Sequence, residues 1–305
     1  MVETRDPAIE ALDAIPLLAV RPRTVDELSG GLTNRNLKVG TPDRTFVARC
    51  SRSDTGLLGI DRDAEHLNTR AAERAGVAAP VHAYHPEVGV LVIGYIDGFT
   101  YDNATFQRDG VVRRVAEACR RLHSGPAFVN EFDMFARQRR YLSIVRENGF
   151  ALPPGYEEFT DRFAQIEAAF AARPQPLVPC NNDLLAGNFV DDGEKLWLID
   201  YEYSGNNDAC FELGNISTEC DLTPDQLEEL VTAYFGASRR SSIARTRLQA
   251  VVSQYGWSLW GAIQDSTSPL DFDFHAWSME RYERAAATFT SAAFDGLLEE
   301  VQHDD

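Results

Sequence analysis

Residues 179–205 read PCNNDLLAGNFVDDGEKLWLIDYEYSG, and this stretch decides how the rest of the chain is interpreted. Two short β-prone runs, residues 188–190 and 196–199, flank the turn-forming residues 191–194, which is the pattern of a β-hairpin. From residue 110 onward, the apolar residues outside this stretch recur mostly at helical spacing. The hairpin is therefore predicted to be a strand-rich patch within a mainly helical part of the chain.

The predicted hairpin gathers three oxygen-bearing side chains. Folding brings Asn188 and Asp200 to the same end of the strand pair, and Asp183 lies just upstream in the loop that feeds the first strand. Carboxylate and amide oxygens suit Mg²⁺, which proteins bind through one or two side chains together with substrate phosphates. Asp191 and Asp192 have a simpler interpretation as turn formers. The other three residues predict a functional magnesium site.

The chain around this hairpin divides into two parts. A glycine-rich turn at Gly30 and Gly31 opens an antiparallel hairpin, and residues 94–98 form a connector after the last N-terminal strand. Strands are predicted over residues 37–39, 45–49, 81–84 and 88–93, and helices over residues 7–20, 62–75, 110–123, 155–172, 224–235, 243–264 and 275–299. We expect an α+β fold in two lobes: a small β-rich N-lobe, residues 1–97, and a larger, mainly helical C-lobe, residues 98–305.

Composition excludes several classes of function. The chain has 305 residues, with 29 Lys and Arg against 47 Asp and Glu, and a formal net charge of -18. A protein this acidic, without a run of basic residues, is not expected to bind nucleic acid or anionic lipid. No membrane span is predicted, because no stretch approaches roughly 18 uninterrupted apolar residues. Five scattered cysteines favour reduced thiols and a cytoplasmic location over a disulfide frame or a zinc site. The oligomeric state is left open.

Four segments carry a resemblance to a known family. They are LSGGLTNRNLKV at residues 28–39, NNDLLAGNF at 181–189, LWLIDYEYSG at 196–205 and SQYGWSLWGAIQ at 253–264. In this order they resemble the nucleotide, catalytic, metal and tryptophan segments of the choline and ethanolamine kinase family. That family consists of small-molecule phosphotransferases, is similar to the aminoglycoside phosphotransferases, and has a protein-kinase-like fold. The resemblance implies the same two-lobed fold, with ATP and Mg²⁺ as cofactors.

The resemblance also implies roles for individual residues. Asp183 would accept the proton of the acceptor alcohol, and Asn188 and Asp200 would hold Mg²⁺ beside the phosphates of ATP. The implied nucleotide-binding residues are Gly30, Gly31, Thr33, Asn34, Arg49 and Glu65. Arg49 would replace the strand lysine that is usual in kinase-like folds, and Glu65 would orient it.

Two positions depart from the family pattern. The family's catalytic loop reads H-x-D, whereas Asn181 stands at the histidine position, and Glu212 stands where an aspartate supports the loop. Asparagine is shorter and uncharged, but it still donates and accepts hydrogen bonds. We expect both changes to be tolerated, because Asp183 and Asp200 remain.

Tryptophans suggest where an acceptor binds. Trp257 and Trp260 are three residues apart and share one face of a predicted helix, and Trp277 follows in the next helical segment. Aromatic residues at matching family positions surround the substrate's ammonium group, and Glu202 and Glu219 match acidic positions nearby. An indole face attracts a desolvated cation by up to about 2 kcal/mol or more. The same spacing is common in core packing, so both interpretations stay open.

Three functional hypotheses follow from these residues. The leading one is an ATP- and Mg²⁺-dependent kinase that phosphorylates the hydroxyl of a cationic amino alcohol, choline or ethanolamine first. The second is an aminoglycoside-type phosphotransferase, although paired indoles favour the first. The third is a non-catalytic protein that binds a nucleotide or a quaternary amine, motivated by Asn181 and Glu212.

Overall fold

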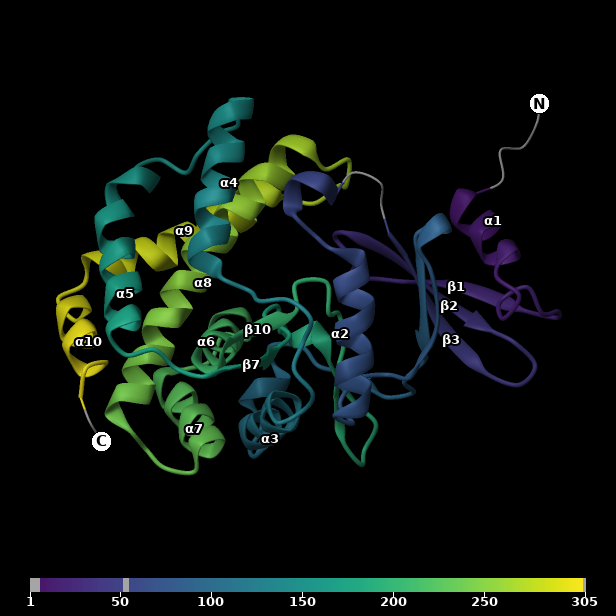
Figure 1. Cartoon of the computed structure of the whole chain (residues 1–305), viewed down its shortest axis with the longest axis horizontal. Coiled ribbons are helices and arrows are strands. Elements are labelled where there is room, and N and C mark those ends of the chain that lie inside the picture. The colour runs from purple at the N-terminus through teal and green to yellow at the C-terminus, as the bar shows by residue number, and fades with distance from the viewer. Residues whose placement is uncertain (1–5, 52–54, 304–305) are drawn as a thin grey trace.

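The structure, a computed structural model, describes residues 6–51 and 55–303, and it has the two-lobed α+β fold predicted above (Figure 1). The N-lobe is built on a five-stranded antiparallel sheet in the order β1-β2-β3-β5-β4. Its strands are β1 (Thr24–Leu28), β2 (Asn34–Gly40), β3 (Thr45–Ser51), β4 (Val81–His85) and β5 (Val90–Gly94). The boundary at residue 97 stays a prediction.

The two faces of this sheet have different neighbours. Phe46 and Ala48 of β3 are buried in a cluster with residues of helix α1 (Pro7–Ala14) and the turn that follows it. Successive side chains of a strand point to opposite faces, so Arg49 lies on the other side, where it meets helix α2 (Arg62–Arg74). The alternation of β3 thus places one charged side chain toward the cleft between the lobes.

The C-lobe consists mainly of helices, several of which pack against one long, buried helix, α8 (Arg240–Thr267). The other helices are α3 (Val111–His123), α4 (Met134–Asn148), α5 (Thr160–Ala172), α6 (Ala209–Glu219), α7 (Pro224–Phe235), α9 (Phe274–Thr290) and α10 (Phe294–Glu300). Helix α8 contacts α4, α6, α7, α9 and α10, and it is buried along most of its length. Its buried residues lie on all sides of the helix and include polar ones such as Gln249, Ser253 and Ser258, so α8 shows no single apolar stripe.

Short strands complete the C-lobe and include the predicted hairpin. Strand β7 (Leu177–Cys180) pairs with β10 (Gly205–Asp208), and β6 (Phe99–Thr100), β8 (Phe189–Asp191) and β9 (Leu196–Leu198) form a three-stranded sheet. Within it Phe189 lies opposite Leu198, so the hairpin prediction is confirmed. Single 3₁₀ turns are η1 (Thr55–Leu58), η2 (Pro86–Val88), η3 (Thr105–Gln107), η4 (Tyr156–Phe159) and η5 (Ala186–Asn188).

Several predicted helices have different bounds in the structure. The helix expected over residues 155–172 begins at Thr160 after a 3₁₀ turn, and the one expected over residues 243–264 spans Arg240–Thr267. The helix expected over residues 7–20 ends at Ala14, because Ile15 precedes a proline and adopts extended backbone angles. The helix expected over residues 275–299 is interrupted between α9 and α10. The ends of these helices depend on local backbone conformation, which cannot be predicted from the spacing of apolar residues.

The prediction missed helices α4 and α6 and strands β1, β6, β7 and β10. Helix α6 contains glycine, serine and threonine and is buried on nearly every side, so neither propensity nor a one-sided stripe indicates it. A Cβ on Gly214 would lie 2.6 Å from the backbone nitrogen of Ala250 on α8. Helix α6 is therefore stabilised by its close packing on α8. Only glycine fits where Gly214 meets the backbone of Ala250. Helix α4 does bury residues at regular helical spacing, so its sequence carries a helical signal.

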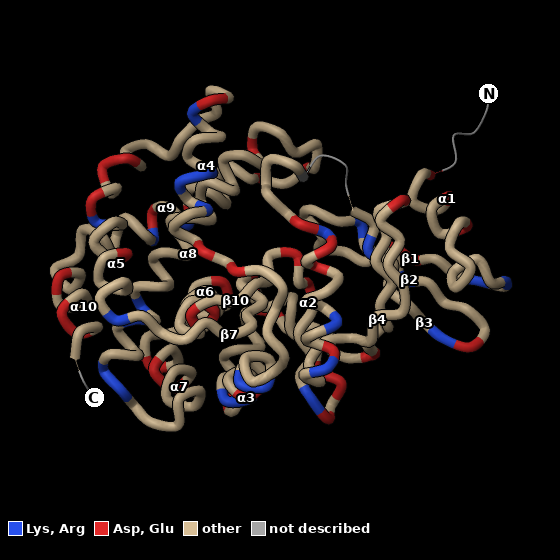
Figure 2. The backbone as a smooth tube through the Cα atoms, in the orientation of Figure 1, with Lys and Arg blue, Asp and Glu red and all other residues tan. Residues whose placement is uncertain are grey.

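Charged residues follow the acidic composition. Acidic and basic positions both lie over the two lobes, and α3 is among the elements that carry several basic positions (Figure 2). Two arginines of α3 form ion pairs with acids on other segments, Arg113 with Glu229 and Arg114 with Asp191, and Arg121 pairs with Glu117 within the helix. Within residues 6–51 and 55–303, no helix combines the length and the apolar character that crossing a bilayer requires.

Candidate active site

The hairpin brings its three oxygen-bearing side chains to one cavity. Asp183, Asn188 and Asp200 all line it. Asn188 Nδ2 donates to the carbonyl of Asp183 over 2.8 Å, and the backbone N–H of Ile199 donates to the carbonyl of Asn188 over 3.0 Å. Because Asn188 donates through its nitrogen, its Oδ1 is left without a hydrogen bond from any described residue. The amide oxygen is therefore available to a ligand.

Asn181 joins the two loops that carry these residues. Asn182 and Asp200 have left-handed backbones, with φ of 68° and 64°, and such strain costs on the order of 1–3 kcal/mol and tends to gather at functional sites. The amide of Asn181 donates to the carbonyls of Ile199 (3.1 Å) and Asp200 (2.8 Å) and accepts from the backbone N–H of Asp183 (3.1 Å). The asparagine at the histidine position still braces the loop.

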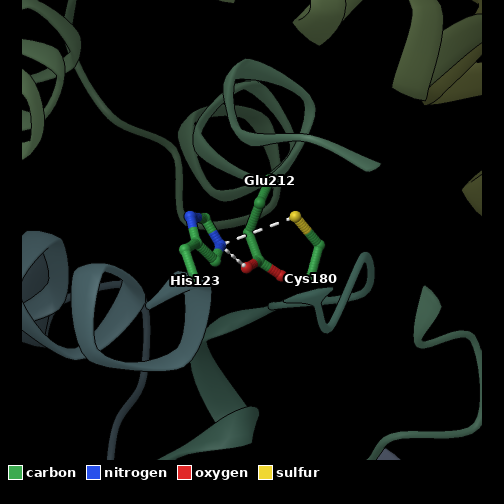
Figure 3. A group of neighbouring side chains, drawn as sticks. All are labelled: His123, Cys180 and Glu212. Atoms are coloured by element: carbon green, nitrogen blue, oxygen red, sulfur yellow. Dashed lines mark hydrogen bonds and ion pairs between the residues drawn. The ribbon is translucent and has the colours of Figure 1, made fainter. Parts of the chain in front are cut away.

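A buried cluster of His123, Cys180 and Glu212 supports the same loop from beneath (Figure 3). Glu212 accepts from the backbone N–H of Asn182 over 2.8 Å and lies 2.5 Å from His123 Nε2, and His123 Nδ1 lies 2.7 Å from the Tyr234 hydroxyl. Burial raises the pKa of the Cys180 thiol well above its usual range. Both ring nitrogens of His123 and both carboxylate oxygens of Glu212 already have hydrogen-bond partners, so the geometry is that of a hydrogen-bonded support.

The glycine-rich loop between β1 and β2 depends on its glycines. Gly30 has φ of 103°, and a Cβ on Gly31 would lie 2.3 Å from the carbonyl oxygen of Asn34. Thr33 Oγ1 donates to one oxygen of Glu202 over 2.6 Å, and Asn34 Nδ2 donates to the other over 2.8 Å. The loop is therefore docked onto Glu202. We expected that residue in the acceptor region, and it lines the cavity while both of its oxygens are in use.

Arg49 lies within a chain of alternating charges. Its Nη2 is 3.0 Å from Glu65 Oε1 and 2.5 Å from Asp200 Oδ1. Arg62 contacts Glu65 over 2.7 Å and Glu202 over 3.2 Å. The structure brings together the expected pair Arg49 and Glu65, and it adds contacts of Arg49 with Asp200 and of Arg62 with both glutamates. Strand β3, helix α2 and the metal loop are linked through these groups.

Three tryptophans line the opposite side of the cavity. Trp257 and Trp260 are buried and Trp277 is half-buried, with 5.1 Å between the ring centroids of Trp260 and Trp277. Trp260 Nε1 donates to the hydroxyl of Tyr203 over 2.7 Å, and Trp257 Nε1 donates to Asn215 Oδ1 over 3.2 Å. These bonds fix the orientation of the rings. Trp257 and Trp260 belong to the core, which confirms the packing interpretation, and they also line the cavity, so their contact with an ammonium group stays a prediction.

Negative charge is concentrated around this space, which has a volume of about 100 Å³. Its acidic lining residues are Asp183, Asp200, Glu202 and Glu219. Burial, together with the charges of Glu202 and Asp200, raises the pKa of Asp183 well above its ordinary 3.8. Burial and the charge of Asp200 also raise the pKa of Glu202 to about 7. Asp183 is therefore suited to accept a proton, whereas the other three carboxylates are paired with arginines.

Three further lining residues were not predicted. Leu32, Leu185 and Tyr203 all line the cavity. Tyr203 lies three positions after Asp200, and an aromatic residue so close to a predicted ligand was a usable signal. Leu32 has no comparable signal, since one apolar residue in a glycine-rich turn is unremarkable by sequence.

Comparison with known proteins agrees with this geometry. Residues 24–249 match the phosphotransferase enzyme family (APH). The crystal structure of a choline/ethanolamine kinase family protein from Mesorhizobium loti matches with a TM-score of 0.86 and 34% identity, over 97% of this chain and 99% of that one. The chain belongs to the choline/ethanolamine kinase family of phosphotransferases. It is a phosphotransferase, an enzyme that transfers a phosphoryl group to an alcohol group of its substrate.

The sequence relatives of this kinase include a probable ethanolamine kinase. The chain is 27% identical over 250 residues to the protein LicA from Haemophilus influenzae, covering 77% of this chain and 72% of that protein. It is 24% identical over 293 residues to a probable ethanolamine kinase from Arabidopsis thaliana, covering 85% and 78%.

Proposed function

We propose that this kinase transfers the γ-phosphoryl group of ATP, in a Mg²⁺-dependent reaction, to the hydroxyl of a small cationic amino alcohol of the choline or ethanolamine type. One observation carries the proposal: Asp183 and Asp200 line the same cavity as Trp257 and Trp260. A proton acceptor and metal-type ligands thus face a surface suited to an ammonium group. The names of the ethanolamine kinase relatives support the same acceptor class.

The metal ligands proposed are Asn188 and Asp200. Arg49 contacts Oδ1 of Asp200, so Oδ2 is left without a hydrogen bond from any described residue, as is Asn188 Oδ1. These are hard oxygen donors of the kind that Mg²⁺ takes. When bound, Mg²⁺ neutralises charge on the phosphates as the leaving group departs. Arg49 and the backbone N–H groups at Gly30 and Gly31 are proposed to contact the phosphates from the N-lobe side.

Asp183 is proposed to be the general base. The acceptor oxygen attacks the γ-phosphorus, its proton passes to Asp183, and the bond from phosphorus to the bridging oxygen breaks to release ADP. A raised pKa strengthens this carboxylate as a base. Because the deprotonated form is the active one, we expect activity to fall as the pH drops through that raised pKa, well above the range of an exposed aspartate.

The cavity favours a small acceptor over an aminoglycoside. A volume of about 100 Å³ is below the roughly 300–1,000 Å³ of pockets for drug-sized ligands. Indole faces tolerate methyl groups on a cation, whereas a sugar with several ammonium groups needs several free carboxylates. Glu202 is already bonded to Thr33 and Asn34, so it offers none.

A non-catalytic binding protein is also less favoured. Asn181 and Glu212, the departures that motivated it, both make hydrogen bonds that support the catalytic loop. The five cysteines are free and buried, and we propose on that ground that the enzyme works in the reducing environment of the cytoplasm.

The test is release of ADP from ATP and Mg²⁺ in the presence of choline, ethanolamine or a polyamine sugar. We expect turnover with an amino alcohol, little with the sugar, and almost none in Asp183→Ala. Asp192→Asn is the matched control, because Asp192 caps the hairpin turn by accepting from the N–H groups of Glu194 and Lys195. Full activity in Asp183→Ala, or no turnover of any amino alcohol, would contradict the proposal.

A further inference from the structure

Arg281 lies just outside the acceptor cavity and contacts two residues of its wall. Its guanidinium, on α9, forms a forked ion pair with Glu219, in which Nε donates to Oε1 over 3.1 Å and Nη2 donates to Oε2. The same group lies over the ring of Trp277, with 3.4 Å from Cζ to the ring centroid. Glu219 and Trp277 line the cavity, whereas Arg281 lines the neighbouring groove.

This ion pair differs from its neighbour on the same helix. The side chains of Arg281 and Glu219 are 13% and 9% exposed, whereas Arg284 and its partner Asp221 are 42% and 50% exposed. Exposed pairs contribute little, because solvent screens them. A forked pair that is largely shielded from water fixes both side chains and keeps their charges balanced. Glu219 is thus neutralised from inside the protein.

The carboxylates on the acceptor side of the cavity are accordingly already in use. Both oxygens of Glu219 accept from Arg281, and both oxygens of Glu202 accept from Thr33 and Asn34. A quaternary ammonium has no N–H to satisfy and binds to indole faces. A primary ammonium brings three N–H donors, and leaving them unpaired on burial is costly. The cavity is therefore expected to bind a quaternary ammonium more favourably than a primary one.

On the basis of the proposed function, we infer that Arg281 is a positioning residue that sets acceptor specificity: by occupying Glu219 and holding Trp277, it makes the cavity prefer a quaternary ammonium alcohol to a primary one. The preference comes from a cation of the protein itself, which takes the carboxylate that a primary ammonium would need. Removing that cation frees the carboxylate at the cavity wall.

The experiment compares kcat/KM for choline and for ethanolamine in wild type and Arg281→Gln. Wild type should prefer choline, and Arg281→Gln should shift the ratio toward ethanolamine by about tenfold, the effect of one hydrogen bond to a charged group. The shift should arise mainly in KM. Because both substrates report on the same active molecules, the ratio does not depend on how much of the variant is folded. Arg284→Gln is the matched control and should leave the ratio unchanged.

Two further variants separate neutralisation from a loss of structure. In the double variant Glu219→Gln/Arg281→Gln no carboxylate is freed, so the ratio should return toward wild type. Arg281→Lys keeps the positive charge and should stay within a few-fold of the wild-type ratio. A merely structural role predicts equal losses for both substrates in every Arg281 variant.

The outcomes distinguish this inference from the proposed function. An active Arg281→Gln enzyme with an unchanged ratio, or a wild type that prefers ethanolamine, overturns the role of Arg281 and leaves the kinase activity intact. An enzyme that phosphorylates neither alcohol contradicts the proposed function. In that case the affinity ratio for choline and ethanolamine, measured by tryptophan fluorescence, still tests Arg281: a shift in Arg281→Gln supports its role and no shift overturns it.

Discussion

Two regions meet at one cavity: the catalytic segment, with Asp183 and Asp200, and the tryptophan wall, formed by Trp257, Trp260 and Trp277. They are held there in different ways. Asp183 and Asp200 lie in loops whose backbones are joined by the side chain of Asn181. The wall instead depends on the packing of α8 against α9, where a Cβ on Gly261 would lie 2.9 Å from the ring of Trp277. One region is positioned by hydrogen bonds to the backbone and the other by contact between side chains.

This difference predicts a division of kinetic effects. Changes in the catalytic segment alter the groups that interact with the transferring phosphoryl group, so they should lower kcat. Changes in the wall alter contacts with a part of the acceptor that does not react, so they should raise KM. Each variant below either sharpens this division or breaks it.

The largest effect is expected for Asp200→Asn. The change removes a charge that is proposed to hold Mg²⁺ and also the partner of Arg49, 2.5 Å away. Loss of several kcal/mol of charge stabilisation lowers kcat by about 10³-fold or more. Steady-state kinetics over a Mg²⁺ titration measures this. A wild-type kcat at saturating Mg²⁺ would show that Asp200 is not a metal ligand.

A smaller loss is expected for Asn181→Ala. Two carbonyls, at Ile199 and Asp200, lose a donor, and the left-handed backbone of Asp200 loses its support. At about 1 kcal/mol per hydrogen bond, kcat should fall about 10- to 30-fold with little change in KM, and the melting temperature should also fall. Asn148→Ala, which removes a hydrogen bond at an exposed helix end, is the control. Unchanged kcat with a lowered melting temperature would limit Asn181 to stability.

The wall variants should produce the smallest effects and the opposite kinetic pattern. Trp257→Leu and Trp260→Leu each remove an indole face worth about 0.5–2 kcal/mol to a cation, so KM for choline should rise about 3- to 30-fold while kcat changes little. Trp197→Leu is the matched control, because Trp197 is bonded to Asp192 at the tip of the hairpin and does not line the cavity. A fall in kcat without a rise in KM would break the division.

The same contrast explains what the sequence could predict. The hairpin is local, so strand propensity and turn residues were enough to bring Asn188 and Asp200 to one end and to place Asp192 in the turn. The role of Arg281 and the contact at Gly261 arise where helices distant in sequence meet. No local pattern carries that information.

Glu202 shows a further limit of reasoning from position alone. The family resemblance predicted a place in the acceptor region, and Glu202 does line the cavity. Its bonds to Thr33 and Asn34 cross from one lobe to the other, so they depend on how the lobes are placed. Residue types in sequence indicated which side chains gather, and the fold decides which of them are left free.

Phosphorus-31 NMR of ATP, Mg²⁺ and choline with wild type and Asp183→Asn tests the central claim most directly. The account predicts a new phosphomonoester signal that grows in step with ADP in wild type and is nearly absent in the variant. Inorganic phosphate in place of the ester, or the same ester signal in Asp183→Asn, would contradict it.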